Sequence, residues 1–135
     1  MYCYNGYFPI EISFEEYSLS GTSCEWKNSA TYIQLPQSVD IVDCNEDLER
    51  YFECVGDDMY PLIDFSKRTL VIAHGIASSP VKVNCNSLQQ FSEQNYRMEL
   101  YVKVGIAAVQ THWQVPIIVE KLNEQSIIEL IITIK

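Results

Sequence analysis

Two histidines and five cysteines are the side chains of this sequence with the chemistry for nucleophilic catalysis. His74 stands where an apolar run meets Gly75, and His112 stands beside Trp113. A thiol becomes a catalytic nucleophile when an imidazole lies within hydrogen-bond reach, and no motif places a cysteine or an acid beside either histidine. A lone histidine at a strand end is more often a surface or hydrogen-bonding residue. We therefore predict that the protein is not an enzyme, with a thiol or carboxylate hydrolase as the lesser alternative.

Motifs for other site chemistry are missing or incomplete. The sequence has no GxSxG, HExxH or glycine-rich phosphate loop. Asp57, Asp58 and Asp64 offer oxygen ligands to a hard cation, but they lack the alternating carboxylates and closing glutamate of an EF-hand loop. Glu15 and Glu16 are adjacent, so on a strand they point to opposite faces, unlike the carboxylates of a glycosidase. We predict no catalytic residue, no cofactor and no metal site.

The cysteines show neither a CxxC pair nor a Cys/His cluster, so their spacing does not support a zinc site. Cys24, Cys44 and Cys54 lie in polar or loop-like segments, where a lone thiol gains little from burial. We expect one or two disulfides and an oxidising compartment. The alternative, a cytoplasmic protein with only thiols, stays open. The odd number leaves at least one cysteine unpaired within the chain, and the spacing does not give the connectivity.

Aromatic side chains near the amino terminus are the candidate partner surface. Tyr2, Tyr4 and Tyr7 crowd the first residues, and we add Trp26 and His112 to this candidate ligand or partner surface. Tyrosine is favoured at interfaces because it joins apolar area to a hydroxyl group. The competing interpretation, which we weight more heavily, packs the amino-terminal rings against the core.

The charge is strongly acidic and unevenly placed. The net charge is −9, and residues 1–68 carry 13 acidic and 4 basic side chains, whereas residues 69–135 carry 5 of each. Nucleic acids and anionic membrane surfaces are disfavoured as partners because both require clustered Lys and Arg. No run of about 18 apolar residues is present, so the sequence predicts no membrane span.

The carboxyl-terminal third has the clearest strand signals. Apolar residues alternate with polar ones over 96–106 and again over 109–119, a period of two that predicts half-buried strands. Pro116 cannot donate to a ladder, so it predicts an edge position or a bulge. Both faces of 127–135 are apolar, which predicts a strand covered on both sides. Short links between the three strands suggest an antiparallel meander.

Upstream elements are predicted from shorter patterns. Leu48, Tyr51, Phe52 and Val55 form an apolar stripe, which predicts a helix over residues 45–55 ended by Gly56. We expect strands at 10–14, 32–35, 39–42, 69–73 and 81–86, a hairpin loop at 74–80 and one helical turn at 87–92. The predicted core consists of Leu48, Phe52, Leu70, Ile72, Val83, Leu100, Val102, Trp113, Ile117, Leu130 and Ile132.

Asp64-Phe65-Ser66-Lys67 and Thr69-Leu70 follow a predicted short helix and Cys54. This arrangement resembles the DFSK.TLL segment, preceded by a short helix and a cysteine, of small, uncharacterised lipoproteins of Bacteroides-type gut bacteria. HWQVPIIVEKL resembles their tryptophan-containing strand, with matches at Trp113, Lys121 and Leu122. The likeness spans residues 39–134 at most. It implies export and anchoring through a lipidated cysteine, and it assigns no catalytic residue.

Together these patterns predict an α+β fold over a single domain, residues 1–135. We expect a mostly antiparallel β-sheet, curled towards a barrel or sandwich, with one main helix packed on it. We predict a non-enzymatic cell-envelope protein that recognises a protein or peptide; the alternative is a module for a small ligand or glycan. The expected location is the periplasm or cell surface, although residues 1–3 do not read as an export leader, so the cytoplasm is the alternative.

Overall fold

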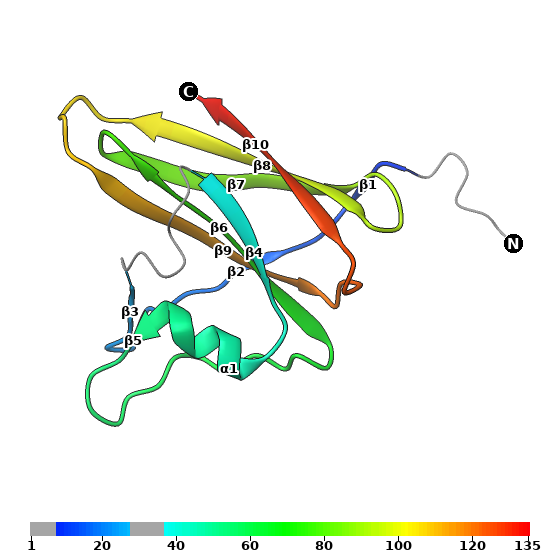
Figure 1. Ribbon diagram of the computed structural model, residues 1–135, viewed down its shortest axis with the longest axis horizontal. Coiled ribbons are helices and arrows are strands. Elements are labelled where there is room, and N and C mark those ends of the chain that lie inside the picture. Colours follow the sequence, from blue (N-terminus) through cyan, green and yellow to red (C-terminus); the bar gives the residue numbers. More distant parts are fainter. Residues whose placement is uncertain (1–7, 28–36) are drawn as a thin grey trace, which may run out of the picture.

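The computed structural model describes residues 8–27 and 37–135. Two four-stranded sheets lie face to face, and a smaller layer covers the outer side of one of them (Figure 1). Sheet A contains, in spatial order, β1 (Ile10–Glu11), β7 (Val81–Gln90), β8 (Asn95–Val104) and β10 (Ile127–Ile134). Sheet B contains β2 (Glu15–Glu16), β9 (Thr111–Glu120), β6 (Arg68–Ala77) and β4 (Gln37–Val42). The two sheets do not close into a barrel. The predicted fold is therefore confirmed only coarsely, as a mostly antiparallel, sandwich-like arrangement of two sheets with a short helix.

The covering layer combines a short helix with a small ribbon. Its elements are α1 (Asn45–Leu48), the 3₁₀ turn η1 (Glu49–Tyr51), β3 (Glu25–Trp26) and β5 (Phe52–Glu53). β3 and β5 pair antiparallel, and a disulfide between Cys24 and Cys54 continues their register by one pair. Within the described residues both helical segments are far too short to cross a membrane.

Apolar side chains form two cores that lie on opposite faces of sheet B. We call the first the cover core; it joins sheet B to the covering layer and contains Tyr17, Cys24, Val42, Leu48, Tyr51, Phe52, Tyr60, Ile63, Leu70 and Ile72. We call the second the sandwich core; it joins the two sheets and contains Val71, Ala73, Leu88, Tyr96, Met98, Leu100, Val115, Ile117, Val119 and Leu122. The unbroken apolar run of β6 follows from this, because alternate residues of β6 enter different cores.

The predicted core is confirmed in its centre. Leu48, Phe52, Leu70, Ile72, Leu100, Val102 and Ile117 are buried. The remaining members, Val83, Trp113, Leu130 and Ile132, are half-buried and pack against the sandwich core from strand ends or from the sheet margin.

The predicted meander is wrong. β8 lies in sheet A and β9 in sheet B, and β10 returns to sheet A, where it pairs in parallel with β8. The link at 74–80 is not a hairpin loop either, because β6 extends to Ala77 and the chain then crosses from sheet B to β7 in sheet A. Alternation shows which side chains are buried but not which sheet a strand joins.

The predicted helix is shorter than its apolar stripe suggests. Leu48, Tyr51 and Phe52 are buried, but α1 and η1 end at Tyr51, and Val55 is exposed. Phe52 belongs to β5, where it pairs with Trp26, and the disulfide holds Cys54 beside β3. Gly56 therefore does not end the helix; it adopts a left-handed conformation (φ 64°) in the turn after β5.

Two further strand predictions are corrected. Residues 87–92 do not form a helical turn, because β7 continues to Gln90 beyond a register shift between Cys85 and Ser87. The shift changes the face that alternate residues occupy, so Leu88 enters the sandwich core and the simple alternation ends. Residues 10–14 form no single strand; β1 pairs with β7 in sheet A, and β2 pairs with β9 in sheet B.

The main-chain nitrogen and carbonyl of Pro116 point away from β6, towards the outer side of β9. The Pro116 carbonyl accepts a hydrogen bond from the Tyr17 N–H (3.1 Å), and β2 pairs with β9 only at Ile117 and Ile118. In an antiparallel strand the N–H and C=O of one residue point the same way, so the missing N–H of Pro116 leaves the β6–β9 ladder intact. Neither the edge position nor the bulge predicted from Pro116 is found: β2 lies on the outer side of β9, and the register of Pro116 with Ile72 contains no bulge.

Candidate functional site

β10 presents an unpaired main-chain edge. The Ile127 N–H donates to the Gln94 carbonyl (2.7 Å), and the Lys135 N–H donates to the Val102 carbonyl (2.8 Å). Odd-numbered residues of β10 therefore bond towards β8, and the alternate residues point their N–H and C=O groups outward. Those outward residues are Ile128, Leu130, Ile132 and Ile134. No strand among the described residues pairs with that outer side of β10.

The apolar side chains of β10 are more exposed to solvent than those of most apolar strands. Ile127 and Ile134 are 63% and 71% exposed, and the residues between them are at most half-buried. The prediction that β10 is covered on both faces is therefore wrong. A long apolar strand with a free edge is normally shielded by charges, proline or a covering loop. The only charged residue within β10 is Glu129, which pairs with Arg97 of β8 (3.0 Å).

A groove of about 730 Å³ opens beside the first residues of β10. One wall comes from residues 126–128, and the other comes from β4, the outer strand of sheet B. Asp47, Arg50 and Tyr51, from α1 and η1, complete the lining. The groove lies where the two sheets and the covering layer meet, and it reaches the first two residues of β10, Ile127 and Ile128.

Asp40 joins the groove to the interior. Its Oδ2 accepts a hydrogen bond from the Tyr51 hydroxyl (2.7 Å) and lies 3.1 Å from Nε2 of His74. His74 is 1% exposed, whereas the Asp40 side chain is 31% exposed and borders the groove. Asp40 follows two residues after Ser38, which is opposite His74 in the β4–β6 ladder, so the carboxylate and imidazole meet diagonally on one face of sheet B.

The surroundings keep Asp40 ionised. Burial raises the pKa of the carboxyl group, but the hydrogen bond from Tyr51, the close contact with His74 and the positive charge of Arg50 lower it by a larger amount, so the pKa lies below its ordinary value. Burial also raises the pKa of Tyr51, and its bond to Asp40 adds to this effect. At neutral pH Asp40 is therefore a carboxylate, and Tyr51 is a neutral hydroxyl that donates a hydrogen bond to it.

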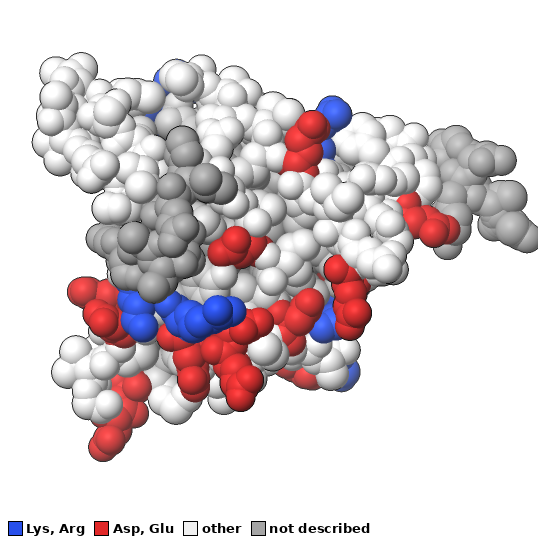
Figure 2. Space-filling model, viewed as in Figure 1, with Lys and Arg blue, Asp and Glu red and all other residues white. Residues whose placement is uncertain are grey.

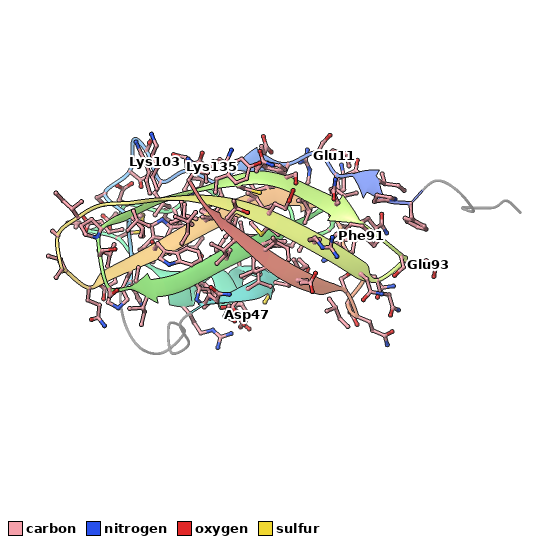
Figure 3. The ribbon with its side chains drawn as sticks, turned by 90° about the horizontal axis from the view of Figure 1, so that it is seen from above. Glu11, Asp47, Phe91, Glu93, Lys103 and Lys135 are labelled. Atoms are coloured by element: carbon pink, nitrogen blue, oxygen red, sulfur yellow. A yellow bond between two sulfur atoms is a disulfide. The ribbon has the colours of Figure 1, made fainter. Side chains whose placement is uncertain are left out.

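The groove lining contains two carboxylates and one basic side chain, so one negative charge is left unbalanced. Arg50 pairs with Asp47 (2.7 Å), which leaves the Asp40 carboxylate as the remaining charged group of the lining. Figure 2 shows acidic side chains, with basic ones among them, gathered over the lower part of this face around α1, and a largely uncharged surface above them. Figure 3 shows β10 running across the molecule, from the side on which Asp47 lies to the side of Lys135.

The Asp40–His74 pair satisfies part of the geometry of a general base. A hydrolase would also need the imidazole to reach a substrate, and His74 of β6 is buried in sheet B, beneath the half-exposed Asp40. The two cysteines that are free thiols in the described chain lie elsewhere, Cys44 before α1 and Cys85 on β7. We assign the pair a positioning role, in which His74 and Tyr51 hold the carboxylate of Asp40 at the groove.

The sequence-predicted surface residues do not meet at this groove. Tyr2, Tyr4 and Tyr7 lie outside the described residues. Trp26 is half-buried in the covering layer, where its ring packs edge-on against Phe52 at 4.6 Å between centroids. His112 lies on β9, opposite Ile76 in the ladder with β6. Trp113 packs against the sandwich core, so the two tryptophans belong to different cores and share no pocket.

Asp40 and the edge of β10 were missed by sequence reasoning. Asp40 is a polar position within the predicted strand 39–42 that no local pattern distinguishes, because its contacts with Tyr51 and His74 depend on strand register and on the position of η1. The signal for the edge was the presence of apolar residues on both faces of 127–135, which equally describes a buried strand. Three or more His, Cys, Asp or Glu side chains grouped to hold a metal are not found within residues 8–27 and 37–135.

In comparisons with known proteins, no protein-family model, curated protein or solved structure matches the chain.

Proposed function

We propose that the protein is a non-enzymatic interaction module, which binds an extended segment of another protein by strand addition to the outer edge of β10. The observation that carries this proposal is the row of outward N–H and C=O groups at alternate residues from Ile128 to Ile134. Main-chain hydrogen bonds to such an edge supply affinity, and pockets for alternate side chains supply specificity. The half-buried and exposed isoleucines of β10 offer apolar contacts to a segment with alternating apolar residues.

The edge differs from the other open strands in its length and charge. β10 has eight residues and one charged side chain, whereas β4 has six and places the Asp40 carboxylate at its centre. The outer side of β9 is already paired with β2 at Ile117 and Ile118, and Pro116 beside them lacks an N–H donor. An added strand at β10 therefore meets a longer unbroken set of donors and acceptors than one at β4 or β9.

A peptide titration with two matched variants tests strand addition. The probe is an acetylated and amidated peptide of alternating threonine and valine, about as long as β10. Binding to the ¹⁵N-labelled protein should shift the amide resonances of the outward-facing β10 residues, and it should saturate. Ile132→Pro removes an outward N–H and leaves the bonds to β8 in place, so it should weaken binding about tenfold or more.

Ile132→Ala is the matched control because it loses the same packing but keeps the N–H group. It should bind the peptide almost as well as the parent protein. Strand addition at β10 is overturned if the peptide causes no shifts, if the shifts fall on another element, or if the proline and alanine variants bind alike.

The proposed location is the cell envelope, outside the cytoplasm. The disulfide between Cys24 and Cys54 supports it, because such bonds persist in oxidising compartments and are rare in the cytosol. Mass mapping of non-reduced protein from its native cells, after free thiols are blocked, should find these two cysteines linked. Recovery of both as blocked thiols would contradict export.

A further inference from the structure

We infer that the segment bound at β10 carries a lysine or arginine at one end, and that the cation enters the groove and pairs with Asp40. This inference rests on the proposed strand addition, and it names the chemistry of the partner. Residues 126–128 connect the two features, since they begin the β10 edge and also line the groove opposite Asp40. The end of an added strand nearest to Ile128 is therefore the end beside the carboxylate.

The carboxylate of Asp40 is arranged to receive a donor. Both of its contacts with Tyr51 and His74 are made by Oδ2. Oδ1 has no hydrogen-bond partner within the chain as described, although a carboxylate oxygen has room for two donors. The two contacts fix the orientation of the group before any ligand arrives, so little side-chain entropy remains to be lost on binding.

Charge complementarity favours a cation as the occupant. Asp47 is already paired with Arg50, so the surplus negative charge of the lining falls on Asp40. The groove also has apolar walls, formed by Val39, Ile41 and Ile127. The methylene groups of a lysine or arginine side chain can lie along such walls while the charged end reaches the carboxylate. An acidic residue at the same place would meet like charge from Asp40, which disfavours it.

Three peptides test the inference on the intact protein. They share the alternating threonine and valine sequence and carry a lysine at the first position, a lysine at the last position, or glutamine at both. One of the two lysine peptides should bind about fivefold more tightly than the glutamine peptide, which corresponds to the upper range for a partly exposed ion pair. The other should not, because general attraction to an acidic protein does not distinguish the two ends. The preference should decrease as salt is raised.

Two variants show whether Asp40 causes the preference. Asp40→Asn keeps an acceptor for Tyr51 and removes the charge, so it should abolish the preference and give the lysine and glutamine peptides equal affinity. Glu46→Gln makes the same change of charge at an exposed position of α1 outside the groove, and it should retain the preference. Equal binding of all three peptides, or a preference that survives in Asp40→Asn, overturns the inference while strand addition stands. Failure of all three peptides to bind overturns both proposals.

Discussion

At the scale of single residues, the Asp40 network links three elements of the molecule. Tyr51 comes from η1, Asp40 from β4 and His74 from β6, and the three side chains meet at the boundary between sheet B and the covering layer. Hydrogen bonds to an ionised acceptor are stronger than those between neutral groups. The network therefore both orients the carboxylate and ties the covering layer to the sheet.

Removal of one hydroxyl group should reveal the strength of that tie. Tyr51→Phe keeps the ring in the cover core but removes the donor to Asp40, so we expect the free energy of unfolding to fall by about 1–2 kcal/mol. The pKa of Asp40 should rise at the same time. Urea denaturation measures the first effect and carboxyl ¹³C NMR the second. An unchanged pKa of Asp40 would show that this hydrogen bond does not form.

The lowered pKa of Asp40 also predicts how stability depends on pH. In the unfolded chain the Asp40 carboxyl group has a pKa of about 3.9, and in the folded protein its pKa is lower. Its stabilising contribution is therefore complete above the unfolded pKa and is lost as the pH falls through the folded pKa. Asp40→Asn should lose less stability on acidification below about pH 4 than the parent protein does. Urea titrations at several pH values test this, and a slope as steep as that of the parent would contradict it.

The two free thiols of the described residues, Cys44 and Cys85, should differ in reactivity. Burial raises the pKa of the Cys85 thiol to about 11. The thiol also donates a hydrogen bond to the Ser87 carbonyl. Cys44, by contrast, is exposed before α1. At pH 8 only about one Cys85 side chain in a thousand is then a thiolate, the reactive form. Brief treatment with iodoacetamide should modify Cys44 well before Cys85, as read by peptide mass spectrometry. Equal rates would place Cys85 in an open environment.

At the scale of elements, the sequence predicted burial better than it predicted pairing. The alternation from Tyr96 to Val102 identifies β8 and its inward face correctly, because side chains of a strand alternate between faces whatever its neighbours are. The alternation fails at Val104 and Ile106, which are exposed where the chain leaves sheet A. The parallel pairing of β10 with β8 depends on contacts about 30 residues apart, and no local pattern encodes it.

The candidate site was least accessible to sequence reasoning for the same reason. Asp40 and His74 were visible as individual residues, but their approach depends on the antiparallel register of β4 and β6. The edge of β10 is a property of sheet order, since an apolar strand with both faces covered and one at a sheet margin have similar sequences. The two cysteines of the disulfide were candidates, but the register of β3 with β5 was needed to choose them.

The disulfide is the element-level feature that holds the covering layer together. Cys24 and Cys54 are 30 residues apart, and closure of a loop of this length restricts the unfolded chain by about 3–4 kcal/mol at 25 °C in the chain-entropy model. The double variant Cys24→Ser with Cys54→Ser should lose about this much stability in a denaturation experiment. Cys44→Ser, which removes a free exposed thiol, should change stability little. Similar losses in both variants would show that the bond contributes no specific restraint.

At the scale of the whole molecule, sheet B is shared by two cores. Leu70 and Ile72 of β6 enter the cover core, and Val71 and Ala73 enter the sandwich core. The sandwich core joins long strands of both sheets, whereas the covering layer consists of short elements restrained by one disulfide. The covering layer should therefore be the less stable unit once that restraint is removed, since local stability follows buried apolar contact and chain connectivity.

The two tryptophans provide one fluorescent probe in each unit. Trp26 packs against the cover core and Trp113 against the sandwich core, and the chain has no other tryptophan. Trp113→Phe leaves Trp26 to report on the covering layer, and Trp26→Phe leaves Trp113 to report on the sandwich. Under reducing conditions, the Trp26 signal should change at a lower urea concentration than the Trp113 signal; with the disulfide intact, the two midpoints should move closer together. Coincident transitions under reducing conditions would show that the strands shared by the two cores make the molecule unfold as one cooperative unit.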